Sequence, residues 1–338
     1  MDPLTHGLLG ATIGQAFCVR RLGPRAMAAG AMAGMAPDLD VVMMATGPMG
    51  DWIYHRGVTH SIWVAALLGP ALAYAAARSQ AGGRRAWTLL FVLTLLSHPL
   101  LDWCTSYGTQ LLAPLSAHRF ALDAVAIIDP AYSLLLLAAL LVGAWRGVAA
   151  RGAALSAAVA LVLSTAYLGH GLMLNREAEA RAREQLEAEG VRGAEVRAYP
   201  TLLQLYLRRL VARQGDEVRV GWLSLWSPQP IAWQRFAGTR DARVEAARET
   251  GEGRILEWFA MGQTVASLHP SATGSVVEID DLRYGFPSRP REGLWGIRVR
   301  FDATGRIEGR PERIDRPLPA PARALLVQIF RDTFGPRR

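Results

Sequence analysis

Long apolar runs in the first 175 residues restrict the fold of this chain more than any other feature of its sequence. They consist mostly of Ala, Leu, Val, Met and Gly, and they lie at about 7–19, 26–47, 60–77, 86–103, 123–145 and 152–174. Several of them approach the roughly 20 residues that a helix needs to cross a bilayer. We therefore expect a mainly α protein, in which a polytopic helical membrane domain of about six helices precedes a soluble α+β domain.

The composition changes near residue 175, where Arg and Glu become frequent. We place the domain boundary there, with the membrane domain at 1–175 and the soluble domain at 176–338. A charged helix over 175–190 should lead away from the membrane. Within the soluble domain the periodicity favours strands at 217–226 and 294–301, and helices at 240–268 and 321–334.

The arginines of the membrane domain predict its orientation. Most of them lie in the short connections after the first, third and fifth runs, as Arg20, Arg21, Arg25, Arg78, Arg84, Arg85, Arg146 and Arg151. By the positive-inside rule these connections face the cytoplasm. The N-terminus, the connections at about 48–59 and 104–122, and the soluble domain then face outward.

Histidines and aspartates interrupt the apolar runs near their predicted outward ends. An Asp at mid-membrane depth costs roughly 2.5–3.5 kcal/mol on insertion scales, so ionisable residues in such segments indicate a functional site. They form a possible metal-ligand set: His6, His55, His60, His98 and His118, with Asp38, Asp40, Asp102 and Asp123. Imidazole and carboxylate groups suit a divalent metal, zinc before manganese. Because these side chains are expected at one face of the membrane, they can converge.

Local patterns support this interpretation but leave alternatives open. His98 and Asp102 are four residues apart and would share one face of a helix, one turn from each other. Pro37 disfavours helix for the preceding residue, so the second run should be broken beside Asp38 and Asp40. The alternatives are an Asp that only caps a helix end, an interfacial loop that contains His55 and His60, and an interfacial His6 on the first turn of its helix.

Two further patterns concern substrate binding and packing. Arg56 lies between two histidines, and its planar guanidinium suits a phosphate or carboxylate of a substrate. Arg119 could likewise neutralise a lipid phosphate at the interface. Gly30 and Gly34 form a small-xxx-small pattern, which predicts a surface where helices pack closely rather than a chemical role.

Four motifs occur in a specific order: Asp-Pro-Leu-Thr-His-Gly at 2–7, Pro-Asp-Leu-Asp at 37–40, His-Arg-Gly-Val-Thr-His-Ser at 55–61 and Ser-His-Pro-Leu-Leu-Asp at 97–102. Together they resemble the LexA-regulated, YdjM-like family of bacterial inner-membrane metal-dependent hydrolases, over about residues 1–130. That family is similar, more distantly, to the zinc-dependent phospholipase C and single-strand nuclease superfamily, whose helical proteins hold clustered zinc ions with His and Asp. The resemblance implies a metal-dependent hydrolase whose candidate metal ligands are His6, Asp38, Asp40, His55, His60, His98 and Asp102.

The distant superfamily also uses a terminal amine and a late His-x-x-x-Asp/Glu pair. Here Met1 precedes an acidic residue, and only His118 and Asp123 could substitute for the late pair. We therefore expect two ions rather than three. In this mechanism Asp38 is the general base, Asp40 is a ligand, and Arg56 binds the substrate.

The expected function is hydrolysis of a phosphoester or lipid-derived substrate at the outer face of the inner membrane. The expected partners are the lipid bilayer and a phospholipid or other amphipathic substrate, and no nucleic acid is expected. A metal- or proton-coupled transporter is an alternative, although it would favour internal repeats and polar residues that track across the bilayer. A structural or sensory membrane protein with a closed metal site is another, although it would need neither a free arginine nor a spare carboxylate.

Overall fold

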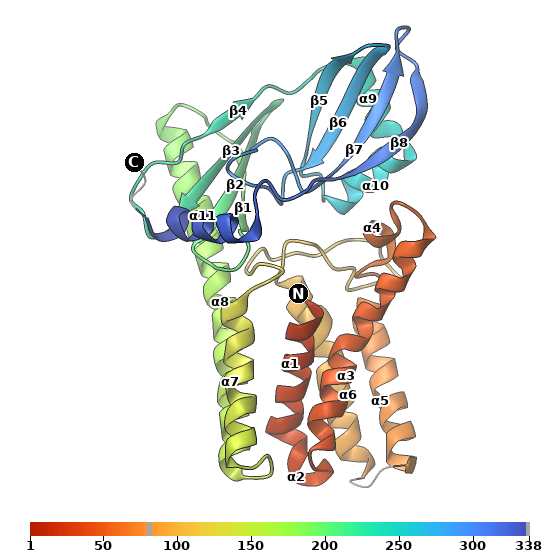
Figure 1. Cartoon of the computed structure of the whole chain (residues 1–338), viewed down its shortest axis with the longest axis vertical. Coiled ribbons are helices and arrows are strands. Elements are labelled where there is room, and N and C mark those ends of the chain that lie inside the picture. The colour runs from red at the N-terminus through yellow and green to blue at the C-terminus, as the bar shows by residue number, and fades with distance from the viewer. Residues whose placement is uncertain (80–82, 336–338) are drawn as a thin grey trace. The chain divides into compact units, whose positions relative to one another are not determined.

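The computed structural model describes residues 1–79 and 83–335, and these form two compact units (Figure 1). The first unit comprises Met1–Thr46, Tyr54–Leu172 and Leu202–Gln204, and the second comprises Gly47–Ile53, Met173–Thr201 and Leu205–Arg338. Each unit has its own fold and is described separately.

The first unit is helical (Figure 1). Its elements, in chain order, are α1 (Pro3–Ile13), the π-helix η1 (Gly14–Cys18), α2 (Val19–Leu22), α3 (Arg25–Met35), the 3-10 helix η2 (Ala36–Thr46), the 3-10 helix η3 (Val58–His60), α5 (Ile62–Ser79), α6 (Arg84–Trp103), α7 (Pro130–Arg146) and the first part of α8 (Arg151–Ala188). The short helix α4 (Gly50–Tyr54) lies almost entirely in the second unit.

Two predicted helix boundaries are confirmed. Asp2 caps α1, since its carboxylate accepts a hydrogen bond from the backbone N–H of Thr5 at 3.0 Å, and Pro3 takes the first helical position. The second apolar run is broken as predicted, because α3 ends at Met35 and the chain continues as the 3-10 helix η2 through Pro37.

The prediction of about six membrane helices is not supported. Among the described residues, two helices are long and apolar enough to cross a membrane, Arg84–Trp103 and Arg151–Ala188. The pair Gly50–His60 and Ile62–Arg78, bent by 55°, raises the number to three if it counts as one span. Other apolar runs do not form single long α-helices; for example, α7 begins only at Pro130, where Asp129 caps it.

Glycines allow α1 and α3 to pack closely, which confirms the predicted packing role of Gly30 and Gly34. A Cβ atom on Gly10 would overlap the carbonyl oxygen of Gly30, and one on Gly34 would overlap the carbonyl oxygen of His6. The two helices can therefore approach only because these positions carry no side chain. This contact fixes the part of α1 that carries His6 against the end of α3.

The second unit contains two four-stranded antiparallel sheets, with strand orders β1-β2-β3-β4 and β5-β6-β7-β8 (Figure 1). The fold is therefore mixed overall rather than mainly α. The strands are β1 (Glu195–Pro200), β2 (Leu207–Gln214), β3 (Glu217–Ser224), β4 (Gln234–Phe236), β5 (Thr264–Ser271), β6 (Gly274–Asp281), β7 (Trp295–Asp302) and β8 (Ile307–Asp315). Its further helices are α9 (Ala242–Glu249), α10 (Gly251–Phe259) and α11 (Ala322–Phe334).

The predicted strands near 217–226 and 294–301 are confirmed as β3 and β7, and the predicted helix at 321–334 is confirmed as α11. The helix expected over 240–268 is only partly correct. It is divided into α9 and α10, and the chain then turns through Met261 and Gly262, both with positive φ, into β5.

The charged helix expected near 175–190 is the continuation of α8, which runs without a break from the apolar segment to Ala188. Its last turns belong to the second unit. Ala178, Ala182 and Leu186 repeat every four residues and pack with β-sheet residues such as Leu210 and Leu223 in one buried cluster. This one helix therefore supplies a candidate membrane span and part of the core of the second unit.

Candidate metal centre

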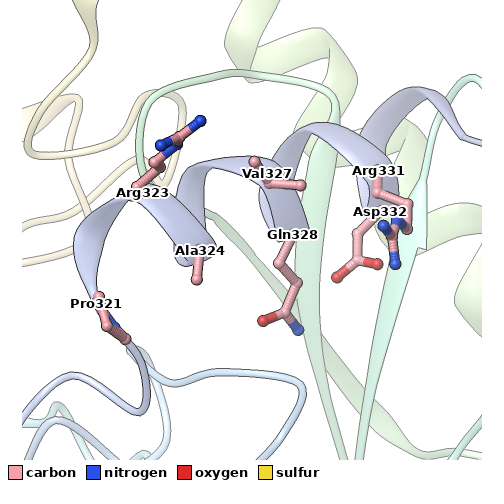
Figure 2. A pocket seen from close by; sticks show the side chains of 7 residues that line it. All are labelled: Pro321, Arg323, Ala324, Val327, Gln328, Arg331 and Asp332. Carbon is pink, nitrogen blue, oxygen red and sulfur yellow. The ribbon is translucent and has the colours of Figure 1, made fainter.

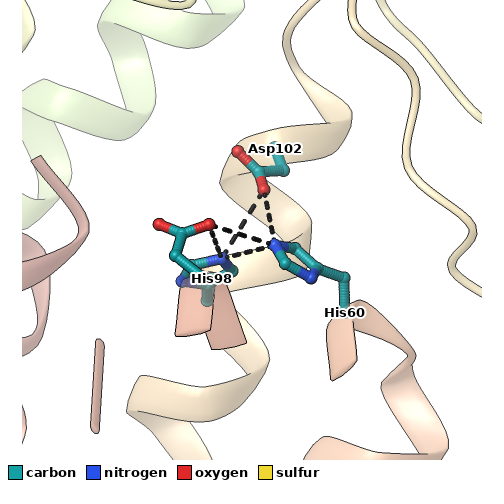
Figure 3. A group of neighbouring side chains, drawn as sticks. His60, His98 and Asp102 are labelled. Atoms are coloured by element: carbon teal, nitrogen blue, oxygen red, sulfur yellow. Dashed lines mark hydrogen bonds and ion pairs between the residues drawn. The ribbon is translucent and has the colours of Figure 1, made fainter. Parts of the chain in front are cut away.

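Two histidines and two aspartates from three segments meet in a buried group in the first unit. They are Asp38 in η2, His60 in η3, and His98 and Asp102 in α6, and one ligand atom from each lies within 4.8 Å of the others. All four residues are buried. Figure 3 shows His60, His98 and Asp102 pointing toward one another, although they are separated by up to 42 positions in the sequence.

The distances between these ligand atoms resemble the edges of a tetrahedron. Nε2 of His60 lies 2.9 Å from Nε2 of His98. Oδ1 of Asp38 lies 3.3 Å and 3.5 Å from these two nitrogens, and Oδ2 of Asp102 lies 3.3 Å and 3.6 Å from them. Four donors bound tetrahedrally at about 2.0–2.2 Å from zinc would lie about 3.3–3.6 Å apart. The group therefore has the size and the donor types that suit such a cation.

Hydrogen bonds fix the orientation of both imidazoles in this group. Nδ1 of His98 lies 2.6 Å from the carbonyl oxygen of Gly34, so it must be the donor. Nδ1 of His60 faces Oδ2 of Asp40 at 3.2 Å. Each ring therefore turns Nε2 toward the other ring, and a proton or a metal cation must lie between these two nitrogens.

Two carboxylate oxygens at the centre also lack hydrogen-bond partners. Among the described residues, Oδ2 of Asp38 and Oδ2 of Asp102 are buried and accept no hydrogen bond, although Oδ2 of Asp102 faces Nε2 of His60. Burying an unpaired carboxylate oxygen is costly. A divalent cation between the four side chains would balance the charge of both carboxylates and bind the facing imidazole nitrogens. A single proton would not do both.

A second group consists of Asp40, His55 and His60, so His60 belongs to both groups. The carboxylate of Asp40 already has four partners: Nδ1 of His55 at 2.7 Å, the backbone N–H of Arg56 at 3.1 Å, Oγ1 of Thr59 at 2.7 Å and Nδ1 of His60 at 3.2 Å. Asp40 thus has the bonding pattern of a carboxylate that orients metal-binding histidines.

Three nitrogen groups contact Oδ1, the other carboxylate oxygen of Asp102. Nε2 of His6 lies 3.1 Å and Nη2 of Arg56 lies 3.2 Å from Oδ1 of Asp102, and the amino nitrogen of Met1 also contacts this oxygen. The ring of His6 stacks on that of His98, with centroids 3.6 Å apart. His6 is therefore at the centre, but its Nε2 is directed to Oδ1 of Asp102, not to Oδ2, which faces His60 and His98.

Arg56 is engaged inside the protein, in contrast to the free substrate-binding role that the sequence suggested. Its Nη1 donates to Oγ1 of Thr105 at 2.7 Å, and its guanidinium lies 4.7 Å from the centre of the Tyr107 ring. The residue is buried and adopts a positive φ of 60°. This geometry indicates that Arg56 balances the charge of Asp102.

The structure thus brings together all seven of the predicted metal-ligand candidates. His118 and Asp123 do not belong to either donor group that the described residues form, and His118 is exposed. Three contacts were not predicted from the sequence: that of the Met1 amino group with Asp102, that of Thr59 with Asp40, and that of Thr105 with Arg56. Thr59 lies inside the motif at 55–61, but a hydroxyl within a motif does not by itself indicate its partner.

Comparisons with known proteins agree with the motifs. A family model described as the YdjM inner membrane protein matches residues 1–178. The chain is also similar to the inner membrane protein YbcI of Escherichia coli (strain K12), with 38% identity over 122 residues, which cover 35% of this chain and 69% of YbcI. No solved structure matches. The region matched by the family model contains every residue of both donor groups.

Proposed function

The chain belongs to the YdjM inner membrane protein family, and from this membership and the geometry of the centre we propose that it is a membrane-bound metal-dependent hydrolase. We propose a phosphoester or lipid-derived substrate at the outer face of the inner membrane. The observation that carries the proposal is the buried group of Asp38, His60, His98 and Asp102, whose donor atoms have the spacing of a tetrahedral site.

The four side chains of this group would hold a divalent cation, with zinc favoured over manganese by the donor types and the spacing. Such an ion polarises a phosphoryl or carbonyl oxygen and makes a bound water more acidic. For hydrolysis the protein must also provide a base. Oδ2 of Asp38 is suited to accept the proton that the attacking water loses. Oδ1 faces the two imidazoles, while Oδ2 has no hydrogen-bond partner among the described residues.

The geometry supports different roles for the two neighbouring aspartates. We assign Asp38 as ligand through one oxygen and base through the other, and Asp40 as a positioning residue rather than a ligand. A second ion at Asp40, His55 and His60 would have to displace hydrogen bonds that the Asp40 carboxylate already accepts. One ion in the four-residue group is therefore better supported than the two expected from the sequence.

The proposed arrangement in the membrane follows the arginine distribution. Residues 1–175 would form the membrane-embedded hydrolase domain, with its connections rich in Arg in the cytoplasm, and residues 176–338 would form a soluble periplasmic domain. The bilayer would then be the immediate partner of the first domain, and a phospholipid or another amphipathic molecule would be the substrate.

A structural or sensory metal-binding role is a second candidate, and one observation favours it. The four-residue group could fill all positions of a tetrahedral cation with protein donors, as closed structural sites do, and Arg56 is already bonded to Asp102 and Thr105. A catalytic site must instead keep one position for water or substrate.

Metal content and hydrolysis, measured on the same samples, distinguish these candidates. We expect the purified wild-type protein to carry zinc or manganese and to hydrolyse phospholipid or a generic phosphodiester. His98→Ala should lose both properties, whereas His269→Ala, which changes an exposed histidine of β5, should keep both. Bound metal without hydrolysis in the wild type would favour the structural role. Retention of metal and unchanged activity in His98→Ala would refute the proposed centre.

A further inference from the structure

One face of α11 is apolar and remains largely exposed in the part of the chain that the structure describes. Leu326, Val327, Phe330 and Phe334 are exposed, with Phe330 at 67%, whereas Leu325 and Thr333 on the other side of the helix are buried. The exposed residues repeat at the spacing of one helical face. Single exposed apolar residues are common, but a continuous stripe of this kind marks an interaction surface.

Trp226, an exposed aromatic residue in the loop after β3, extends this apolar face of α11. The ring of Trp226, 61% exposed, lies 6.2 Å from that of Phe334, and the ring of Phe330 lies 5.1 Å from that of Phe334. Arginines accompany the apolar residues. Figure 2 shows Arg323 and Arg331 at the hollow along α11 that Val327 also lines. Apolar and aromatic side chains together with Arg are the composition of a helix that lies in a membrane interface.

The hydrogen bonds of α8 show at which end of the sheet β1-β2-β3-β4 the exposed face of α11 lies. Along α8, Glu179 accepts from the backbone N–H of Ala198, and Asn175, one turn earlier, accepts from Nη1 of Arg208 at 3.1 Å. Arg208 lies at the start of β2, whose first residue, Leu207, pairs with Ser224 at the end of β3. The end of this sheet at which β2 begins and β3 finishes therefore lies at the level of Asn175 on α8.

α11 is attached at this same end of the sheet. Oγ of Ser224 donates to the carbonyl oxygen of Thr333 at 2.6 Å, and Trp226 follows two residues later. In Figure 1 the axis of α11 runs in a different direction from that of α8, and α11 is drawn beside the ends of β2 and β3. The exposed stripe of α11 and Trp226 are therefore close to the level of Asn175.

Asn175 is also where the apolar part of α8 ends. The run at 152–174 precedes it, and Arg176 and Glu177 follow it. At 1.5 Å per residue this run is about 35 Å long, which is enough for a hydrocarbon core of about 30 Å. If α8 crosses the bilayer, Asn175 emerges at its surface, and the stripe on α11 is at the depth of the lipid headgroups.

We propose that α11, together with Trp226, is an interfacial helix that docks the second unit onto an anionic phospholipid surface. Leu326, Val327, Phe330 and Phe334 enter the boundary between headgroups and acyl chains, and Arg323 and Arg331 bind lipid phosphates. The positive charge of these arginines complements anionic lipid, and the position beside the end of α8's apolar run makes the bilayer the nearest large apolar phase. This inference does not depend on hydrolase activity.

Contact with acyl chains can be measured in the full-length protein by fluorescence quenching. A fluorophore is attached at Val327→Cys, after Cys18 and Cys104 have been replaced by Ala, and the protein is placed in nanodiscs whose lipids are brominated on their acyl chains. We expect strong quenching at this position by the brominated lipid. The matched control is the same fluorophore at Ile307→Cys, an exposed apolar position on β8, which should be quenched by aqueous iodide instead.

Lipid charge provides the second arm of the test. Quenching at position 327 should be stronger with phosphatidylglycerol than with phosphatidylcholine alone, and Arg323→Gln with Arg331→Gln should remove this difference. Equal bromolipid quenching at positions 327 and 307 would overturn the proposal. Protection of position 327 from both bromolipid and iodide would also overturn it, because the stripe would then be covered by protein, either a second copy or another partner.

Discussion

At the scale of single residues, His60 joins the two donor groups through the two nitrogens of one ring. Its Nε2 faces Asp38, His98 and Asp102, and its Nδ1 faces Asp40. A carboxylate behind the ring fixes the tautomer and increases the basicity of the nitrogen that binds the metal. The two aspartates of the Pro-Asp-Leu-Asp motif therefore act on opposite sides of His60.

This division of roles predicts different effects for two similar substitutions. Asp38→Asn should abolish metal binding under conditions in which the wild type is saturated, because it removes a donor of the four-residue group. Asp40→Asn should lower metal affinity by about 10- to 100-fold, as is typical when an orienting partner is lost. Competition titration with a chelating dye measures both affinities. If Asp40→Asn loses the metal completely and Asp38→Asn retains it, the assignment is reversed.

Asp280 in the second unit gives a residue-scale prediction for pH. Burial raises the pKa of Asp280 to about 7, despite the ion pair with Arg316 at 2.9 Å. In the unfolded chain an Asp titrates near about 3.9, so the folded state binds the extra proton between these values. This stabilising contribution is complete below about pH 4, is lost as the pH rises through about 7, and corresponds to at most about 4 kcal/mol.

Hydrogen exchange of the peptide that contains β6 tests this prediction. The ratio of exchange rates between wild type and Asp280→Asn, compared at equal pH, removes the intrinsic pH dependence of exchange. Because Asn resembles the protonated carboxyl group, we expect the wild type to lose protection relative to the variant between pH 4 and pH 7. A ratio that stays constant over this interval would contradict the raised pKa.

The sequence predicted the members of the centre better than their roles. His6, His98 and Asp102 stand out because ionisable side chains are expensive in apolar segments. The roles of Asp38 and Asp40 depend on the direction of each side chain from η2, and two acids separated by one residue give no such information. Arg56 suggested a free oxyanion-binding group, but the position of Asp102 beside it could be known only from the fold.

At the scale of secondary-structure elements, the centre depends on the close contact between α1 and α3. Gly34 has two functions there: it leaves space for the carbonyl oxygen of His6, and its own carbonyl oxygen accepts the hydrogen bond of His98. α3 carries no candidate metal ligand itself. It nevertheless supports His6 in α1 and His98 in α6.

Gly34→Ala should therefore weaken the centre although no donor is changed. Its Cβ would overlap the carbonyl oxygen of His6, and the resulting separation of α1 and α3 should cost about 1–3 kcal/mol, as is typical of overpacking. We expect lower thermal stability and lower metal affinity. The control is Gly169→Ala in α8, where a Cβ meets nothing within 4 Å. Equal effects of the two substitutions would argue against the packing explanation.

Hydropathy located the apolar runs but could not show where helices break within them. The run at 26–47 contains both α3 and the 3-10 helix η2, and the run at 123–145 starts in an extended segment before α7. Such breaks depend on Pro37 and on the cap at Asp129, which local signals reveal only in part. In contrast, the alternation of residue types predicted β3 and β7 correctly, although β3 is buried at nearly every position.

At the scale of the whole molecule, the centre and the second unit have separate sources of stability. All residues of the two donor groups lie within Met1–Thr46 and Tyr54–Leu172, which belong to the first unit. The second unit has its own buried clusters, one of which includes Val220, Trp222 and Leu282. Metal binding should therefore stabilise one unit and leave the other unchanged.

Removal of the metal tests this separation. Binding at about 1,000 times the dissociation constant stabilises the folded state by about 4 kcal/mol. After treatment with a chelator, we expect faster hydrogen exchange in peptides from α6 and η3, with unchanged exchange in β2 and β7. Restoring zinc should reverse the effect. Equal acceleration in both units would show that they do not unfold independently.

The positions of the donors along the chain also have a consequence for biosynthesis. Every donor of both groups precedes Trp103, so about two-thirds of the sequence given is still unmade when the ribosome has completed Asp102. At about 5–20 residues per second, translation of the remainder takes on the order of ten to fifty seconds. If the centre binds a metal as proposed, the nascent protein thus has time to acquire it before either sheet has been synthesised.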